Sequence, residues 1–372
     1  MTTATRIETA DGQAVTVVSN TPSVTAWAAR YMGTWWTAGG VAPDTVTGPT
    51  VVADLDPEEY DALTADVLTG GFEETTYANA RLVYRTRSHS SIVLASQPDD
   101  ILAYEWRPDD QRLRIVGEDA TAVAAATARL AREIVRGLLL ADGWHILHAS
   151  AVTRPEDGAT VLALGDKGAG KTTSGFLLAR TGLHLLANDR VFVRAEGDTI
   201  RVLPWPSAAA IGFGLLHAVG WYQPVRERLQ VGEEMHPTQH QRVTDALLAG
   251  DRTPLWKSGG KELKPQFFPD QLSRWLGLTL ATEGTAAALL FPTIAPDSEP
   301  TLTDSGRMVQ PSDFIGSATE DRYPDVFGLL PEPRPAHGLL ARLAQLPYQA
   351  VTLNHDTASS TTVLQKAVGL SL

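Results

Sequence analysis

The chain contains no cysteine, and this absence excludes several classes of protein. Disulfide scaffolds, thiolate zinc sites and cysteine nucleophiles all need the missing side chain, whereas a reducing cytoplasm is permitted. The first residues, MTTATRIETADGQ, lack the charged and apolar regions of a signal peptide. Apolar runs such as residues 286–291 are far shorter than the roughly 18 residues of a membrane span. We therefore expect a cytoplasmic protein without a membrane partner.

An excess of positive charge is also missing. The 372 residues include 31 Lys+Arg against 43 Asp+Glu, so the formal net charge is −12. An extended nucleic-acid footprint needs the opposite balance, and nucleic acid is therefore not an expected partner. What remains is ordinary globular composition, with 43% hydrophobic and 20% charged residues. The length suits two domains.

A glycine-rich stretch near the middle of the chain is the most informative motif. It matches the pattern G-x-x-x-x-G-K-[ST] of a phosphate-binding loop. Glycines let the backbone turn so that successive N–H groups converge on phosphate oxygens, a lysine adds a mobile cation, and a threonine hydroxyl can bind Mg²⁺. The stretch consists of Gly165, Asp166, Lys167, Gly168, Ala169, Gly170, Lys171, Thr172 and Thr173.

The segments on either side of this loop support the same interpretation. Residues 160–164 are a short apolar run that predicts a strand, and residues 171–180 predict a helix that ends at Thr181-Gly182. Such a helix directs its free N–H groups and the positive end of its dipole at the phosphates. The alternative is a glycine-rich turn without a ligand.

Polar residues that could take part in catalysis occur in the sequence both before this strand and after this helix. Residues 144–152 predict a buried strand that forms a hairpin with the strand entering the loop. This pairing would bring His148 near the phosphates, although a lone histidine is most often structural. Residues 183–189 predict another strand that ends in Asn188 and Asp189, where phosphoryl transfer needs a Mg²⁺ ligand or a base. The alternative for Asp189 is the cap of a turn.

The rest of the chain predicts an α/β organisation without a second chemical motif. We expect residues 1–118 to form an α/β domain and residues 119–372 to form the domain with the phosphate loop. An alanine-rich helix at residues 120–140 would lead into the second domain. Residues 256–264 combine two glycines with three lysines. They predict either a loop that closes over phosphates or an acceptor, or a solvated hairpin.

The order of these motifs resembles the HPr kinase/phosphorylase family. His148-Ala149-Ser150, the phosphate loop and residues 182–191 follow one another within about 50 residues. In that family an H-A-[ST] strand, a G-x-S-G-x-G-K-S loop and a G-x-x-L-[IV]-x-D-D-x-V strand have the same order. The resemblance implies a fold like that of phosphoenolpyruvate carboxykinase. It also implies that ATP·Mg²⁺ donates its γ-phosphoryl group to a serine hydroxyl, and related proteins act on ribosomal peptides, such as lasso peptides, or on small molecules.

The resemblance also implies roles for individual residues. Residues 165–173 would cradle the triphosphate, with Lys171 on the β- and γ-phosphates and Thr172 on Mg²⁺. His148 would lie beside the catalytic carboxylate. The paired aspartates of the family fall on Asn188 and Asp189, and an asparagine cannot accept a proton. Asn188 could still orient a hydroxyl, which leaves Asp189 as base, as metal ligand, or as both.

Two further departures from the family narrow the expected activity. Lys167 stands where a serine is common and adds positive charge near the phosphates. The glutamate-bearing R-G-L-G-[IV] segment is not found downstream, which argues against HPr as the acceptor and against phosphorylase activity. Since related kinases often form oligomers, the resemblance is compatible with a homo-oligomer.

The sequence as a whole predicts a two-domain cytoplasmic kinase that uses ATP and Mg²⁺. Its acceptor would be the hydroxyl of a peptide, a protein or a small molecule, selected with the help of the first domain. A nucleotide-dependent switch that hydrolyses ATP is one alternative. A non-catalytic ATP-binding protein that has lost the base is another.

Overall fold

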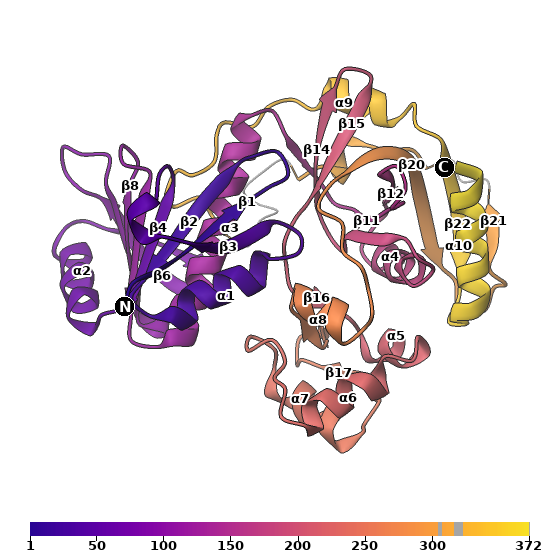
Figure 1. The fold of residues 1–372 in the computed structure, drawn as a ribbon, viewed down its shortest axis with the longest axis horizontal. Helices are drawn as coiled ribbons and strands as arrows, with labels where there is room; N and C mark the ends of the chain where they lie inside the picture. Colours follow the sequence, from indigo (N-terminus) through magenta and orange to yellow (C-terminus); the bar gives the residue numbers. More distant parts are fainter. Residues whose placement is uncertain (304–306, 316–322, 372) are drawn as a thin grey trace. The chain divides into compact units, whose positions relative to one another are not determined.

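The computed structural model describes residues 1–303, 307–315 and 323–371. The chain forms two compact units, each a mixed α/β structure (Figure 1). The first consists of Met1–Trp144 with Gly316–Arg334, and the second of His145–Ile315 with Pro335–Leu372. None of the described helices is both long and apolar enough to cross a membrane.

The boundary between the units differs from the predicted one at residues 118 and 119. The alanine-rich helix α3 (Ala120–Ala141) is part of the first unit, because its apolar face is buried against α1 (Pro22–Met32) and the strands of that unit. Asp119 caps this helix by accepting a hydrogen bond from the Ala122 N–H at 2.8 Å. The helix is therefore part of the core of the first unit, and the second unit begins after Trp144.

The first unit is built on one sheet whose nine described strands have the order β3-β1-β2-β4-β9-β8-β7-β6-β5. Strands β2, β4 and β9 run parallel, and their neighbours are antiparallel. The strands are β1 (Thr3–Glu8), β2 (Ala14–Ser19), β3 (Thr37–Val41), β4 (Thr50–Leu55), β5 (Glu73–Tyr77), β6 (Ala80–Thr86), β7 (Val93–Gln97), β8 (Leu102–Arg107) and β9 (Arg112–Gly117).

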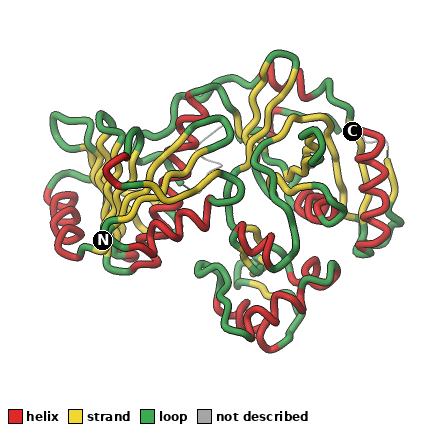
Figure 2. The backbone as a smooth tube through the Cα atoms, in the orientation of Figure 1, coloured by secondary structure: helices red, strands yellow, loops and turns green. Residues whose placement is uncertain are grey.

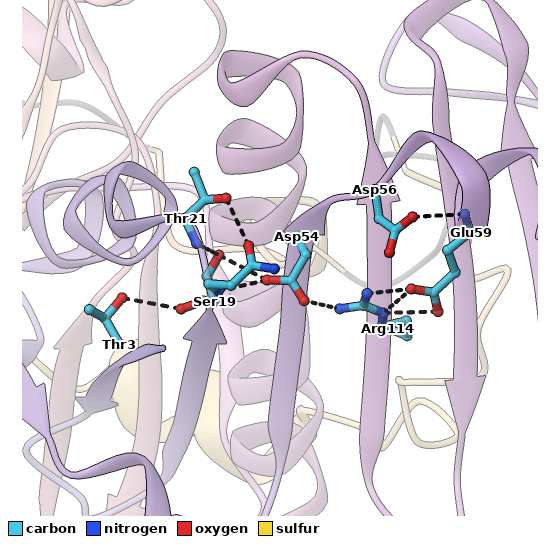
Figure 3. Close-up of polar contacts among 8 residues, drawn as sticks. Thr3, Ser19, Thr21, Asp54, Asp56, Glu59 and Arg114 are labelled. Carbon is cyan, nitrogen blue, oxygen red and sulfur yellow. Dashed lines mark hydrogen bonds and ion pairs between the residues drawn. The ribbon is translucent and has the colours of Figure 1, made fainter. Parts of the chain in front are cut away.

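A polar network joins the ends of the parallel strands (Figure 3). Asp54 near the end of β4 accepts a hydrogen bond from the Asn20 N–H at 2.7 Å and forms an ion pair with Arg114 of β9. Arg114 also donates to Glu59 of α2 (Pro57–Thr69) at 3.0 and 3.1 Å. These bonds fix the start of α2 against the sheet.

The second unit holds the glycine-rich loop and is built on a sheet with the path β10-β14-β15-β20-β12-β11-β13, to which β22 and β21 add beyond β20. The strands β12, β20 and β22 run parallel. The strands are β10 (His145–Leu147), β11 (Ser150–Thr153), β12 (Ala159–Ala163), β13 (His184–Ala187), β14 (Val191–Glu196), β15 (Thr199–Pro204), β20 (Gly284–Ile294), β21 (Thr301–Thr303) and β22 (Tyr348–Leu353).

Helices pack on both faces of this second sheet. Ser150 of β11 faces α4 (Lys171–Ala179), whereas its neighbour Ala151 lies in the hydrophobic cluster that includes Leu339 and Leu343 of α9 (His337–Leu343). The C-terminal helix α10 (Thr357–Ser371), which the sequence did not predict, packs against α4 and β22. Helices therefore cover both faces of the sheet that carries the glycine-rich loop.

An insertion of short helices and two-residue strands, joined by loops, follows β15 and returns to the sheet at β20 (Figure 2). The last helix of the insertion ends at Arg274, and Leu280 further along bridges to Leu185 of β13. The elements of the insertion are β16 (Ala209–Ala210), α5 (Phe213–Ala218), α6 (Tyr222–Gln230), α7 (Gln241–Ala249), β17 (Leu255–Trp256), β18 (Glu262–Leu263), β19 (Gln266–Phe267) and α8 (Pro269–Arg274).

Candidate functional site

The glycine-rich loop joins the end of β12 to the start of α4, in the predicted order of strand, loop and helix. Gly165, Gly168 and Gly170 have φ angles of +151°, +87° and +106°, in the region that favours glycine. A Cβ on Gly170 would lie 2.9 Å from Ile294 Cδ1, and one on Gly165 would lie 3.0 Å from the Ala169 Cβ. Both backbone conformation and space therefore require glycine at these two positions.

The N-terminus of α4 opens directly from this loop. Gly170 is the N-cap residue, and no side chain caps the helix. The first hydrogen bond of the helix runs from the Ser174 N–H to the Gly170 carbonyl at 2.8 Å. The preceding N–H groups have no acceptor within a helix, and together with the helix dipole they favour an anion at this end.

Lys171 lies along the inner side of the loop. Its Nζ donates to the carbonyls of Gly165 at 2.6 Å and Asp166 at 3.1 Å, and the residue is 8% exposed. Burial lowers the pKa of Lys171, and the carboxylate of Asp189 opposes this effect. The ammonium group is thus held between the loop and Asp189, where it can bind phosphate.

The other predicted loop residues differ in exposure. Asp166, Lys167 and Gly168 are exposed at the crest of the loop, whereas Ala169 and Thr173 are half-buried. The Ala169 N–H donates to the Asp166 carbonyl at 3.1 Å and closes the turn. The charge of Lys167 therefore lies at the solvent side of the loop.

Thr172 connects α4 to the end of β13. Its Oγ1 donates to the carbonyl of Asn188 at 3.2 Å. The side chain of Asn188 is buried, and its Oδ1 accepts no hydrogen bond from the described residues. A buried acceptor without a partner costs about 1–3 kcal/mol. An incoming donor such as a hydroxyl would remove this cost.

Asp189 and His148 form a pair next to this connection. The distance from His148 Nε2 to Asp189 Oδ1 is 3.1 Å, and Arg190 Nε lies 3.5 Å from the other carboxylate oxygen. Burial raises the pKa of Asp189, but the hydrogen bond from His148 and the charges of His148, Arg190 and Lys171 lower it, and the net change is downward. The half-exposed carboxylate therefore stays ionised and accepts hydrogen bonds.

The break in the strand predicted at residues 144–152 explains the position of His148. The segment is divided into β10 and β11, because the His148 N–H bonds to the Asp313 carbonyl at 2.8 Å instead of to a neighbouring strand. The hairpin of β11 with β12 is confirmed, with Ser150 opposite Ala163. His148 thus lies at the end of β11 that is nearest to the loop.

Ser150 belongs to the H-A-[ST] motif of the resemblance to the HPr kinase/phosphorylase family, and its contacts hold the fold together. Its Oγ donates to the Ala187 carbonyl of β13 at 3.0 Å. A Cβ on Gly175 of α4 would lie only 2.1 Å from this Oγ. Ser150 therefore joins β11 to β13 and sets how closely α4 approaches the sheet.

Two residues that the sequence reasoning missed also lie at the site. Arg307 donates to Asp313 Oδ1 at 2.7 Å, and its guanidinium lies 5.0 Å from the ring centroid of Phe291. The charge of Arg307 helps to lower the pKa of Lys171, so the site contains a second cation besides Lys171. No local motif surrounds Arg307 or Asp313, and only the tertiary structure identifies them.

Thr172 and Asp189 fit the sparse protein ligation of Mg²⁺. Among the described residues, no group of three or more His, Asp or Glu side chains could hold a metal ion alone. Mg²⁺ bound with a nucleotide usually takes one or two protein oxygens and otherwise phosphate and water. The bond from Thr172 to the Asn188 carbonyl brings a hydroxyl next to the strand end that bears Asp189.

Comparisons with known proteins complete this description. No family model matches the chain, and no curated protein matches it. Among solved structures, it is similar to the Hpr(Ser) kinase/phosphatase from Coxiella burnetii, with 10% sequence identity and a TM-score of 0.24. The alignment covers 60% of this chain and 97% of that chain. At this TM-score the similarity carries no argument about function.

Proposed function

We propose that the protein is a kinase that transfers the γ-phosphoryl group of ATP to a hydroxyl group, with Mg²⁺ as cofactor. One observation carries the proposal: a phosphate loop shaped by glycines lies beside Asp189, an ionised carboxylate held by His148 at 3.1 Å. The order of sequence motifs that resembles the HPr kinase/phosphorylase family supports the same reaction. The acceptor would be a serine of a peptide or protein, or a small-molecule alcohol.

Binding of the nucleotide would use the loop and the start of α4. The N–H groups of residues 165–173 would surround the phosphates, and Lys171 would bind the β- and γ-phosphates. Thr172 and Asp189 would hold Mg²⁺, which supplies charge neutralisation when bound. Arg307 would add a second cation whose charge also acts on Lys171.

The transfer itself would need little covalent help from the protein. The acceptor oxygen would form a bond to the γ-phosphorus while the bond to the β–γ bridging oxygen breaks, and ADP would leave with that electron pair. The acceptor proton would pass to Asp189. Since the pKa of Asp189 is lowered, this carboxylate would mainly orient the hydroxyl and take its proton late in the reaction. Asn188 Oδ1 would supply a second acceptor for that hydroxyl.

A second candidate is a nucleotide-dependent switch that hydrolyses ATP. It is favoured by Asn188, because this position offers an amide where a second carboxylate would assist proton removal. A third is an ATP-binding protein without turnover. In both cases Lys171 and Thr172 would keep their roles in binding.

The destination of labelled phosphate tests these proposals. Purified protein is incubated with Mg²⁺, γ-labelled ATP and a size-fractionated cell extract. Lys171→Ala is expected to abolish labelling, and Asp189→Asn to reduce it by about 10²–10⁴-fold. Lys366→Ala, an exposed lysine on α10, is the matched control. Label on a peptide or small molecule supports the kinase, whereas free phosphate alone supports the switch.

The first unit would select the acceptor or form a homo-oligomer. No chemical motif in its sequence argues for catalysis, and its sheet leaves β3 and β5 as edge strands among the described residues. Removal of residues 1–144 alone would leave Gly316–Arg334 without its partner surface. Light scattering on the full chain is therefore the suitable measurement of oligomeric state.

A further inference from the structure

A hairpin in the helical insertion has features that the proposed chemistry does not use. Strands β17 and β18 pair with Leu255 opposite Leu263 and Trp256 opposite Glu262, in a small sheet of their own. The turn is closed by a hydrogen bond from the Lys257 N–H to the Lys261 carbonyl at 2.9 Å. Gly260 has a φ of +72° within this turn. The hairpin therefore has a defined shape and belongs to the same compact unit as the phosphate loop.

Positive charge is concentrated on this hairpin. The chain has only six lysines, of which two lie in the phosphate loop and three in this hairpin; they are Lys167, Lys171, Lys257, Lys261, Lys264 and Lys366. Residues 252–264 contain four cationic side chains and one carboxylate, although the whole chain has a net charge of −12. The carboxylate, Glu262, pairs with Lys264 at 3.3 Å. Among the described residues no carboxylate forms an ion pair with the exposed Lys257.

An exposed tryptophan lies beside these lysines. Seven of the nine tryptophans are buried, whereas Trp256 is 55% exposed. Strand alternation accounts for its direction, since Leu263 is buried and the adjacent pair of Trp256 with Glu262 projects to the other face. Arg242 of α7 donates to the Trp256 carbonyl at 3.3 Å and holds the strand in place. Tryptophan is enriched among the residues that contribute most of the binding energy of protein interfaces.

We propose that this hairpin binds an acidic stretch of polypeptide, with Trp256 packing on the peptide and the lysines pairing with its carboxylates. Nucleic acid is the less favoured occupant, because its long phosphate backbone would also meet the negative surface expected of a chain with a charge of −12. A short acidic segment of polypeptide can bind to the hairpin alone. This binding is independent of the proposed function, and only its use to deliver a phosphate acceptor would rest on that function.

A binding measurement on the full chain tests the proposal. The probe is a labelled serine peptide with a block of glutamates, and its anisotropy gives the dissociation constant. Lys257→Glu and Trp256→Ala are each expected to weaken binding roughly tenfold. Lys366→Glu, which makes the same charge change at an exposed site on α10, is expected to change it less than about twofold. Lys257→Gln, the milder variant, should give an intermediate loss.

Several results would overturn the proposal. These are equal effects of Lys257→Glu and Lys366→Glu, equally tight binding of a glutamine-block peptide, or tighter binding of single-stranded oligothymidylate. The measurement is made without ATP and Mg²⁺, so that binding is measured independently of phosphoryl transfer. A peptide that binds through the hairpin but never acquires label would be excluded as the phosphate acceptor and would leave the hairpin site standing.

Discussion

At the scale of single residues, the site depends on what keeps Asp189 ionised. Partial burial raises the pKa of this carboxyl group, and the hydrogen bond from His148 is the largest of the effects that lower it. We therefore expect His148→Ala to raise the pKa of Asp189. The measurement is the pH titration of the aspartate carboxyl carbons by NMR, with Asp189→Asn to assign the signal.

His337→Ala provides the control for this prediction, because His337 is an exposed histidine at the start of α9. It should leave the titration of Asp189 unchanged. An Asp189 signal that titrates at the same pH in His148→Ala and in the wild type would show that His148 does not hold this carboxylate in its ionised form.

At the scale of elements, the packing of α4 on β11 positions the glycine-rich loop. Gly175 leaves no room for a Cβ, which would lie 2.1 Å from Ser150 Oγ and 3.3 Å from its Cβ. We expect Gly175→Ala to lower the free energy of unfolding by about 1–3 kcal/mol, because α4 must shift away from the sheet. Urea denaturation measures this change, and nucleotide affinity should fall with it.

Gly338 of α9 is the matched glycine, since a Cβ there meets no atom within 4 Å. Gly338→Ala should leave stability unchanged or raise it by up to about 1 kcal/mol. Adding Ser150→Ala to Gly175→Ala removes the closest atom and should restore part of the loss. If Gly175→Ala and Gly338→Ala behave alike, close packing at Gly175 does not govern the position of α4.

At the scale of the whole molecule, acidic groups in both units have lowered pKa values. Hydrogen bonds from Arg87 and Arg85 lower the pKa of Asp66 in the first unit, and the bond from Arg154 lowers that of Asp157 in the second to about 2. A carboxyl group with a lower pKa in the folded state contributes stability above its unfolded pKa of about 3.9. This contribution is lost as the pH falls through the folded value.

We therefore expect stability against urea to decline between about pH 4 and pH 2, with little change from these groups between pH 5 and pH 7. Asp157→Asn should make the decline less steep. Because the ion pair of Asp157 with Arg154 is exposed, high salt should reduce the effect of this substitution. A decline that is equally steep in Asp157→Asn and the wild type would exclude a contribution from this carboxyl group.

Local sequence was sufficient for the loop and for most of the elements around it. The expected strands at residues 160–164 and 183–189 and the expected helices at 171–180 and 120–140 correspond to β12, β13, α4 and α3. The break within a predicted strand was harder to predict from the sequence. The break at His148 arises from a backbone bond to Asp313, which lies far away along the chain.

The sequence by itself determined the glycine-rich loop, because backbone freedom, a lysine and a threonine within nine residues act over short distances. It also indicated Asp189 as a polar strand end. Only the tertiary structure decided which groups meet there. The bridge of Leu147 with Phe314 brings together segments that are distant in sequence, so that Arg307 and Asp313 join His148 at the site. Such neighbours depend on long-range strand pairing, which no local pattern of residues specifies.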